Sequence, residues 1–257
     1  MRHAAHAARF HCLMPSHATT TTASPPAADT RARLALFDLD HTLLPLDSDY
    51  EWGQFSVRQG LVEGQAFAQR NAEFFEQYRA GTLDLAQYIR FATEAICRLG
   101  PEASLAARQR FMAEVIAPAI LPPAQALLQR HRDAGDEVLI VTATNIFVTE
   151  PIAQALSVPR SHLLAVELER DAHSGWYNGQ IAGVPSMREG KVTRVAQWLQ
   201  QRGWGWQQVH TTFYSDSRND LPLLEQVDVP VAVNPDPTLR QHAQQRGWAI
   251  MDLFAPA

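Results

Sequence analysis

Two aspartates stand one residue apart directly after a short apolar run. Residues 34–37 read Leu-Ala-Leu-Phe, and Asp38 and Asp40 follow, which predicts a buried strand that ends at a polar edge. Two carboxylates this close repel each other unless a cation or a proton lies between them. Aspartate is also a common turn former at strand ends. The pair alone therefore leaves two interpretations open: a turn, or a site that uses a cation.

A second acidic group follows another apolar run. Residues 209–214 are rich in β-forming side chains, and Asp216, Asn219 and Asp220 come soon after them. Asp216 and Asp220 are four residues apart, with the amide of Asn219 between them. The sequence therefore contains two predicted strands that both end in carboxylates.

A hydroxyl and a lysine complete the set of chemically active side chains. Residues 137–141 predict a buried strand that ends in Thr142 and Ala143, ahead of a helix expected from about residue 147. Free N–H groups at such a helix start attract anions, although a threonine there can also be a simple cap or turn residue. Lys191 begins another predicted helix, where a cation is disfavoured by the helix dipole. We therefore expect a counter-charge beside Lys191; the alternative is an exposed lysine.

Strands and helices alternate along most of the chain, which predicts an α/β fold with a parallel, Rossmann-like sheet and helices on both faces. The carboxyl ends of parallel strands meet at one crevice, so these side chains are expected to converge there. Carboxylates with one lysine and one hydroxyl suit Mg²⁺ and a phosphate group. Further strands are expected at 163–168, 229–233 and 248–251, further helices at 122–134, 147–156, 191–201 and 237–246, and a hairpin with an Asn-Gly turn at 175–181.

About seventy residues after the first aspartate pair have a helical pattern. Helices are expected near 50–59, 63–80, 83–99 and 101–116. An insertion of this size directly after the first strand predicts a helical lid over the edge of the sheet. The expected organisation is a disordered tail at 1–32, an α/β core at 33–46 and 122–257, and a helical cap at 47–121.

Composition limits the class of protein. The 257 residues are 46% hydrophobic and 19% charged, with a net charge of −5, which is typical of globular proteins and argues against nucleic-acid binding. No apolar run reaches the roughly eighteen residues of a membrane span. Two cysteines give no disulfide framework and favour a cytoplasmic location. We expect a monomer or homodimer that acts on a small phosphate ester.

Together these motifs resemble the haloacid dehalogenase superfamily, in its phosphoserine-phosphatase-like branch. The resemblance covers about residues 34–253 and depends on the order of the motifs. These are Asp38-Leu39-Asp40-His41-Thr42-Leu43, the strand-end Thr142, Lys191, and Asp216-Ser217-Arg218-Asn219-Asp220. In this family the insertion after the first motif is a helical cap.

The resemblance implies a role for each matched residue. Asp38 would be the nucleophile that becomes an aspartyl phosphate, and Asp40 the general acid and base. Thr142, Ala143 and Lys191 would bind the phosphoryl oxygens.

The same resemblance implies Mg²⁺ as cofactor. The cation would be held by Asp38, Asp216 and the backbone carbonyl of Asp40, with Asn219 and Asp220 as supporting residues. The second aspartate of the first motif favours a phosphate ester over a halide, because halide release needs no proton.

Substrate choice is expected to lie in the cap. Asp47, Asp49, Glu51 and Trp52 are closest to the site in sequence, with Asp47 and Trp52 as the expected specificity residues. Asp47 lies near the position at which phosphoserine phosphatases carry an acid for the substrate amine; it could equally be a helix cap. The segments 47–52 and 142–145 resemble those of bacterial histidinol-phosphatases. Histidinol phosphate is the favoured substrate, ahead of phosphoserine. The alternatives are a broad small-molecule phosphatase and, with less support, a non-catalytic binding protein.

Overall fold

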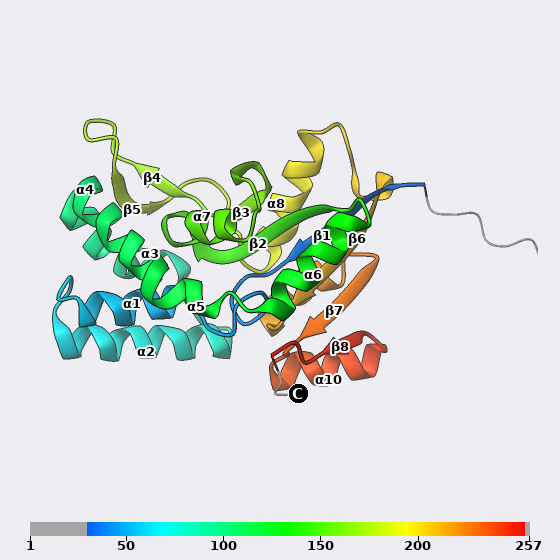
Figure 1. The fold of residues 1–257 in the computed structure, drawn as a ribbon, viewed down its shortest axis with the longest axis horizontal. Coiled ribbons are helices and arrows are strands. Elements are labelled where there is room, and N and C mark those ends of the chain that lie inside the picture. Colours follow the sequence, from blue (N-terminus) through cyan, green and yellow to red (C-terminus); the bar gives the residue numbers. More distant parts are fainter. Residues whose placement is uncertain (1–29, 255–257) are drawn as a thin grey trace, which may run out of the picture. The chain divides into compact units, whose positions relative to one another are not determined.

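A six-stranded sheet forms the centre of the fold, in the order β3-β2-β1-β6-β7-β8 (Figure 1). The structure, a computed structural model, describes residues 30–254. Each neighbouring pair of strands in this sheet is parallel, which confirms the predicted α/β class. The strands are β1 (Ala32–Phe37), β2 (Glu137–Asn145), β3 (Leu163–Val166), β6 (Val209–Ser215), β7 (Val229–Val233) and β8 (Ala249–Met251).

The start of β1 corrects the expected end of the tail. Most of the predicted tail, residues 1–29, lies outside the described residues. Ala32 is already paired with Val209 in the sheet, and the Arg31 guanidinium donates to the Val209 carbonyl at 2.8 Å. The fold therefore begins before residue 33, because β6 offers these residues a pairing partner.

Alternate residues of β1 face opposite layers of helices. Ala35 and Phe37 belong to a cluster that includes side chains of α6 (Pro122–Asp133) and α7 (Ile146–Ala155). Leu34 and Leu36 belong to a second cluster, on the other face. That cluster includes side chains of α8 (Glu189–Gln200), α9 (Leu221–Leu224) and α10 (Pro237–Arg246). Three short 3₁₀ turns lie between these helices and strands: η2 (Arg160–His162), η3 (Trp206–Gln208) and η4 (Arg218–Asp220).

The segment between β1 and α6 is helical, as expected, and Figure 1 shows its helices gathered beside the sheet. The segment expected as one helix at 83–99 is broken near Thr93, whose hydroxyl donates back to the Ile89 carbonyl at 2.6 Å. At Gly100 the chain bends with φ 74°, directly before Pro101. The elements are α1 (Ser48–Arg58), α2 (Gly64–Ala80), α3 (Leu85–Ala92), α4 (Glu94–Phe111), the π-helical η1 (Met112–Ile116) and α5 (Ala117–Ala119).

The predicted Asn-Gly hairpin turn is wrong. Asn178 and Gly179 lie inside β5 (Tyr177–Ile181), which pairs antiparallel with β4 (Leu168–Arg170) in a separate two-stranded sheet. The turn is made upstream, where the Asp171 carboxylate accepts bonds from the following backbone N–H groups, an Asx-type turn. The strand expected at 163–168 is divided for the same reason, since Leu168 pairs in this hairpin.

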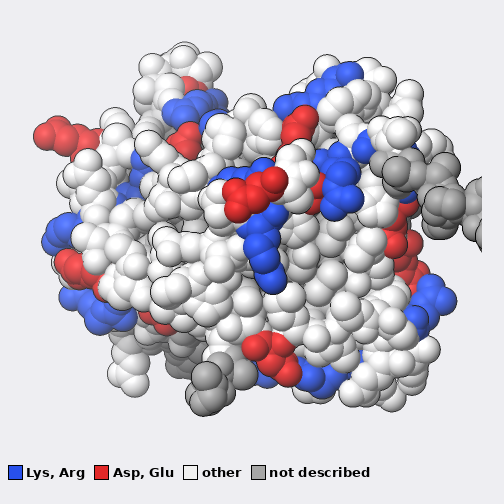
Figure 2. Space-filling view, turned by 45° about the vertical axis from the view of Figure 1, so that its right-hand side comes forward, with Lys and Arg blue, Asp and Glu red and all other residues white. Residues whose placement is uncertain are grey.

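Charged side chains of both signs are interspersed on the face shown in Figure 2. Within residues 30–254 no single helix has the length and hydropathy of a membrane span. The segments Leu85–Ala119 and Pro122–Asp133 meet these criteria only when they are taken together, and the chain bends by 85° between them.

Candidate active site

The predicted site residues meet at the carboxyl ends of β1, β2 and β6. Asp38 directly follows β1, Asp216 directly follows β6, and Thr142 lies near the end of β2; all three line one pocket. The adjacent strands β1 and β6 are where the strand order changes direction, the usual place for a ligand in such sheets.

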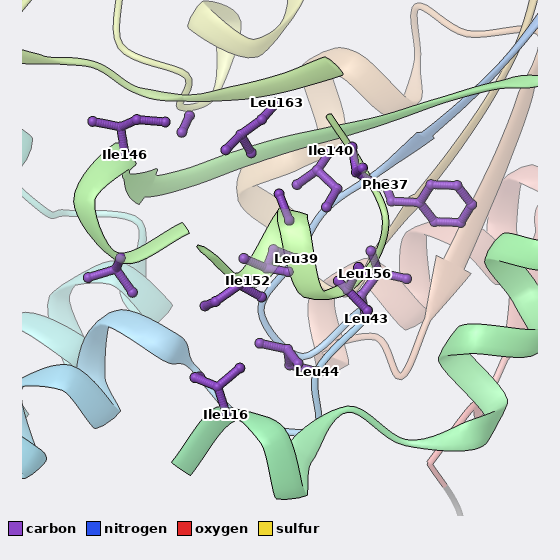
Figure 3. Close-up of a cluster of buried hydrophobic side chains, with 14 of the residues drawn as sticks. Phe37, Leu39, Leu43, Leu44, Ile116, Ile140, Ile146, Ile152, Leu156 and Leu163 are labelled. Carbon is purple, nitrogen blue, oxygen red and sulfur yellow. The ribbon is translucent and has the colours of Figure 1, made fainter. Parts of the chain in front are cut away.

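Buried leucines fix the loop that carries the first aspartate pair. Leu39, Leu43 and Leu44 are fully buried and lie in the hydrophobic cluster shown in Figure 3. The N–H groups of Leu43 and Leu44 both donate to the Leu39 carbonyl. Because the leucines point into the core, Asp38 and Asp40 are left at the pocket.

Lys191 is completely buried between two carboxylates. Its Nζ lies 2.9 Å from Asp38 Oδ1 and 2.6 Å from Asp220 Oδ2, and the Ser215 hydroxyl also donates to Asp220 at 2.7 Å. Burial alone would lower the pKa of this lysine, but its two anionic partners outweigh burial and raise it. The counter-charge expected from the sequence is present, and the alternative of an exposed lysine is wrong.

The start of α8 depends on a glycine. A Cβ at Gly190 would lie 2.0 Å from the Pro185 carbonyl oxygen, a distance that no side chain tolerates. Glycine therefore lets the preceding loop pack against the first turn of α8, which brings Lys191 to the sheet edge.

Asp38 and Asp216 lie close enough together for their carboxylates to repel each other. Burial raises the pKa of Asp38, although Lys191 opposes this. Burial, followed by repulsion from Asp38 and Asp220, raises the pKa of Asp216 well above its usual range. A divalent cation would relieve this repulsion, and Mg²⁺ commonly takes only one or two carboxylates with carbonyl, phosphate and water oxygens. Among residues 30–254 no three His, Cys, Asp or Glu side chains form a group that could hold a metal ion by themselves.

Asp40 is held by two donors. Its Oδ1 accepts from the Ser48 N–H at 2.8 Å, and its Oδ2 accepts from the Thr144 hydroxyl at 2.7 Å. Burial, followed by repulsion from Asp47, raises the pKa of Asp40 to about 6. A carboxyl with this pKa can both give and take a proton near neutral pH.

Thr142 is not a helix cap. It lies inside β2, and the cap of α7 is Asn145, whose side chain accepts from Val148 N–H. The pairing of β2 with β3 is interrupted between Val141 and Asn145, so the intervening residues leave the regular ladder, as is common beside active sites. The Thr142 hydroxyl oxygen accepts from Thr144 N–H at 3.1 Å, which leaves the hydroxyl hydrogen available to a ligand.

The two supporting residues have different partners. Asp220 accepts from Lys191, as described above. Asn219 instead donates its side-chain amide to the Tyr78 carbonyl, at 2.9 Å, in the last turn of α2. Arg188 donates to the carbonyl of Gly81, the C-cap of that helix. These two bonds join the helical insertion to the loops of the site.

Asp47 is the cap of α1. Its Oδ1 accepts from the N–H groups of Asp49 and Tyr50 at 3.1 and 2.8 Å, and the side chain also lines the pocket. Burial raises the pKa of Asp47 to about 6. The structure thus shows Asp47 as a helix N-cap and also places its side chain at the wall of the pocket, so the role in substrate recognition stays a prediction.

Trp52 does not line the pocket, which argues against the role in substrate specificity expected for it. It is 2% exposed and packs against Phe55, Phe111 and Phe147. The ring lies on the buried face of α1, one helical turn after Ser48, and so contributes to the core rather than to specificity.

Asp49 lines the pocket; it is one of the residues of the helical insertion that are close to the site in sequence. It is 4% exposed, and its Oδ1 accepts from the Asn145 amide at 2.9 Å. Burial, followed by repulsion from Asp47 and Asp40, raises the pKa of Asp49 well above its usual range. The signal in the sequence was the Asp-Ser-Asp spacing, which puts both acids in the same helix start.

Comparisons with known proteins agree with this geometry. The profile of the haloacid dehalogenase-like hydrolases matches residues 35–225. A histidinol-phosphatase of Neisseria meningitidis serogroup C is 40% identical over 220 residues, which are 85% of this chain and 98% of the relative. A crystal structure of a Bordetella pertussis Tohama I protein of unknown function is 47% identical and has a TM-score of 0.81, over 88% of this chain and 100% of that one. A substrate-bound phosphoserine phosphatase, 16% identical, has the same fold, with a TM-score of 0.62 over 87% of this chain and 94% of that one. The chain therefore belongs to the family of haloacid dehalogenase-like hydrolases.

Proposed function

We propose that this hydrolase is a phosphatase that cleaves small phosphomonoesters through an aspartyl phosphate on Asp38. The observation that carries the proposal is the contact between Lys191 and Asp38 Oδ1 at the edge of the pocket. The lysine fixes one carboxylate oxygen and leaves Oδ2 to attack. A carboxylate nucleophile with a neighbouring acid is the arrangement that two-step phosphoryl transfer requires.

In the first step, Oδ2 of Asp38 attacks phosphorus and the bond from phosphorus to the alcohol oxygen breaks. Asp40 gives its proton to the departing alkoxide. In the second step, a water attacks phosphorus, Asp40 takes the proton of that water, and the bond to Asp38 breaks to release inorganic phosphate. The bonds from Ser48 and Thr144 hold Asp40 in place for both transfers.

The remaining residues would neutralise charge on the transferred group. The Thr142 hydroxyl, the Ala143 N–H and Lys191 are the donors for the phosphoryl oxygens. Asp38, Asp216 and the backbone carbonyl of Asp40 would hold Mg²⁺, which supplies positive charge against the phosphoryl oxygens when it is bound. The helical segment at 47–121 would act as the cap that excludes water.

The charge of the pocket favours an amino-alcohol phosphate without a carboxylate, and histidinol phosphate first. Five aspartates line the pocket, and no Lys or Arg of the described chain lines it with them. Asp47 and Asp49 would favour a cationic amine, whereas the carboxylate of phosphoserine would find no Lys or Arg of the pocket lining beside these two acids. The Neisseria relative, named a histidinol-phosphatase, supports the same choice.

Phosphate release from a panel of phosphomonoesters tests this proposal. With Mg²⁺ present, we expect kcat/KM for histidinol phosphate to exceed that for phosphoserine by at least about tenfold, because like charges at close range cost more than the 1.4 kcal/mol that this ratio represents. Chelation should remove the activity and Mg²⁺ should restore it. Asp38→Asn, which keeps the shape but not the nucleophile, should lower kcat at least about a thousandfold.

Three other results would contradict parts of the proposal. Equal turnover on sugar phosphates, nucleotides and amino-alcohol phosphates would indicate a broad phosphatase. A preference for phosphoserine would contradict the argument from pocket charge. No turnover on any ester would indicate a binding protein.

A further inference from the structure

The carboxylate of Asp49 has an oxygen without a hydrogen-bond partner. The side chain is 4% exposed and lines the pocket, and its Oδ1 is bonded to the Asn145 amide. No hydrogen bond from any described residue reaches Oδ2, which is itself buried. The Tyr88 hydroxyl from α3 is near enough to act on the carboxyl group of Asp49 as a donor, but it makes no hydrogen bond to Oδ2 in the structure. Buried carboxylate oxygens are normally satisfied, so this one needs an explanation.

The structural roles of Asp49 account for Oδ1 but not for Oδ2. The residue is in the first turn of α1, where the helix dipole favours a negative charge. The bond from Asn145 ties that turn to the end of β2. Neither feature supplies a donor to Oδ2.

The surroundings of Asp49 point to a donor that comes with the ligand. The nearby charges that act on it are those of Asp47 and Asp40, both negative. Apolar and aromatic side chains complete this part of the pocket, including Phe74, Leu85 and Tyr88. A flat ring that carries an N–H group would suit both the apolar walls and the free oxygen.

We propose that Oδ2 of Asp49 accepts a hydrogen bond from a ring N–H at the end of the substrate remote from phosphorus. This inference rests on the proposed function and deepens it. Asp47, the nearer of the two acids to Asp40 in the chain and the larger source of repulsion on it, faces the substrate amine. Asp49 accepts the hydrogen bond from the imidazole, so the two acids recognise two different groups of histidinol phosphate.

The test compares two substrates that differ in the ring. Histidinol phosphate carries amine and imidazole, whereas phosphoethanolamine carries the amine alone. In Asp49→Asn the side chain can offer its one oxygen to Asn145 or to the substrate but not to both. We expect KM for histidinol phosphate to rise at least about tenfold, as for loss of a buried hydrogen bond, with kcat within about twofold and no change in KM for phosphoethanolamine.

A matched control separates this effect from a change of charge. Glu51→Gln removes one negative charge from the same helix turn, at a residue that does not line the pocket, and should leave both KM values unchanged. An equal rise for both substrates in Asp49→Asn would show a structural role and overturn the inference. An unchanged KM for histidinol phosphate would overturn it as well.

Binding of histidinol distinguishes failure of the inference from failure of the proposed function. Histidinol lacks phosphate, so calorimetry on the wild-type protein measures recognition without turnover. The inference predicts binding that Asp49→Asn weakens at least about tenfold. In the wild type, ring-labelled histidinol should show a hydrogen-bonded imidazole N–H by NMR, a readout that needs no variant. Absence of histidinol binding, or of that N–H signal in a bound complex, would overturn the inference. Inactivity of the wild type on every ester, with histidinol still bound, would overturn only the proposed function.

Discussion

Lys191 shows how a buried charge can be kept in place at the residue scale. An unpaired ammonium inside a protein is so costly that it usually loses its proton, yet two carboxylates at 2.9 and 2.6 Å hold this one ionised. The contact orients Asp38 with one oxygen toward the lysine. A lysine at a helix start was a useful signal of a buried site, because the helix dipole disfavours a cation there and its counter-charge had to come from a distant part of the chain.

The pKa of Asp40 makes a prediction about pH. Burial raises it to about 6, so the proton that Asp40 must donate is lost as the pH rises above that value. We expect kcat/KM for histidinol phosphate to fall about tenfold per pH unit above about pH 6. For p-nitrophenyl phosphate, whose leaving group needs no proton, the fall should be much shallower. Measuring both profiles checks the role, and parallel profiles would show that Asp40 is not the acid.

At the scale of elements, the start of α1 organises much of the pocket. Asp47 is the N-cap of this helix, the backbone N–H of Ser48 donates to Asp40, and Asp49 lies in the first turn. The same helix buries Trp52 on its other face. The prediction for Trp52 relied on its closeness to the site in sequence. Neighbouring residues of a helix point in different directions, so the helical period determines which of them line the pocket.

A network at the opposite end of the sheet joins three elements. The Asp136 carboxylate, directly before β2, lies 2.6 Å from Arg33 of β1 and 2.7 Å from His131 of α6. Burial opposes ionisation of Asp136, but these two partners outweigh it and lower the pKa below 3.8.

Asp136→Asn should therefore destabilise the fold in a pH-dependent way. Because the pKa of Asp136 is lower in the folded state than in the unfolded state, its ionised form stabilises the fold at any pH above the unfolded-state pKa of 3.8. This stabilisation is lost as the pH falls through the folded-state pKa. We expect the variant to lose about 1–2 kcal/mol of unfolding free energy at pH 7, and to lose less than the wild type on acidification to pH 3. Urea unfolding at both pH values checks this, with the exposed Asp133→Asn as control. An equal acid dependence in wild type and variant would contradict it.

The sequence predicted elements well where a local signal was sufficient. The expected strand at 229–233 and helix at 237–246 coincide with β7 and α10, since a β-branched run and an Asp-Pro helix start need no distant partner. It failed at the β4–β5 hairpin, where Asn178-Gly179 is a strong turn signal but the Asp171 turn is formed instead. The free oxygen of Asp49 also could not be predicted, because it depends on burial between α3 and β2.

At the scale of the whole molecule, the strand order brings distant segments to one crevice. Asp38 and Asp216 are separated by more than half the chain but follow adjacent strands. The pocket between them and the helical insertion is lined by acids, while charges of both signs are mixed on the surface in Figure 2. The proposed preference for a cationic phosphate ester therefore depends on the lining of the pocket rather than on the net charge. The bonds from Asn219 and Arg188 to the end of α2 hold the insertion over that pocket.

The most direct test of the central claim is to trap the covalent intermediate. Radiolabelled histidinol phosphate, mixed with the Mg²⁺-loaded protein and quenched with acid within milliseconds, should leave label on the protein. Peptide mapping should place that label on Asp38, hydroxylamine should release it, and Asp38→Asn should show none. Steady turnover without labelled protein, or label on a residue other than Asp38, would contradict the proposed mechanism.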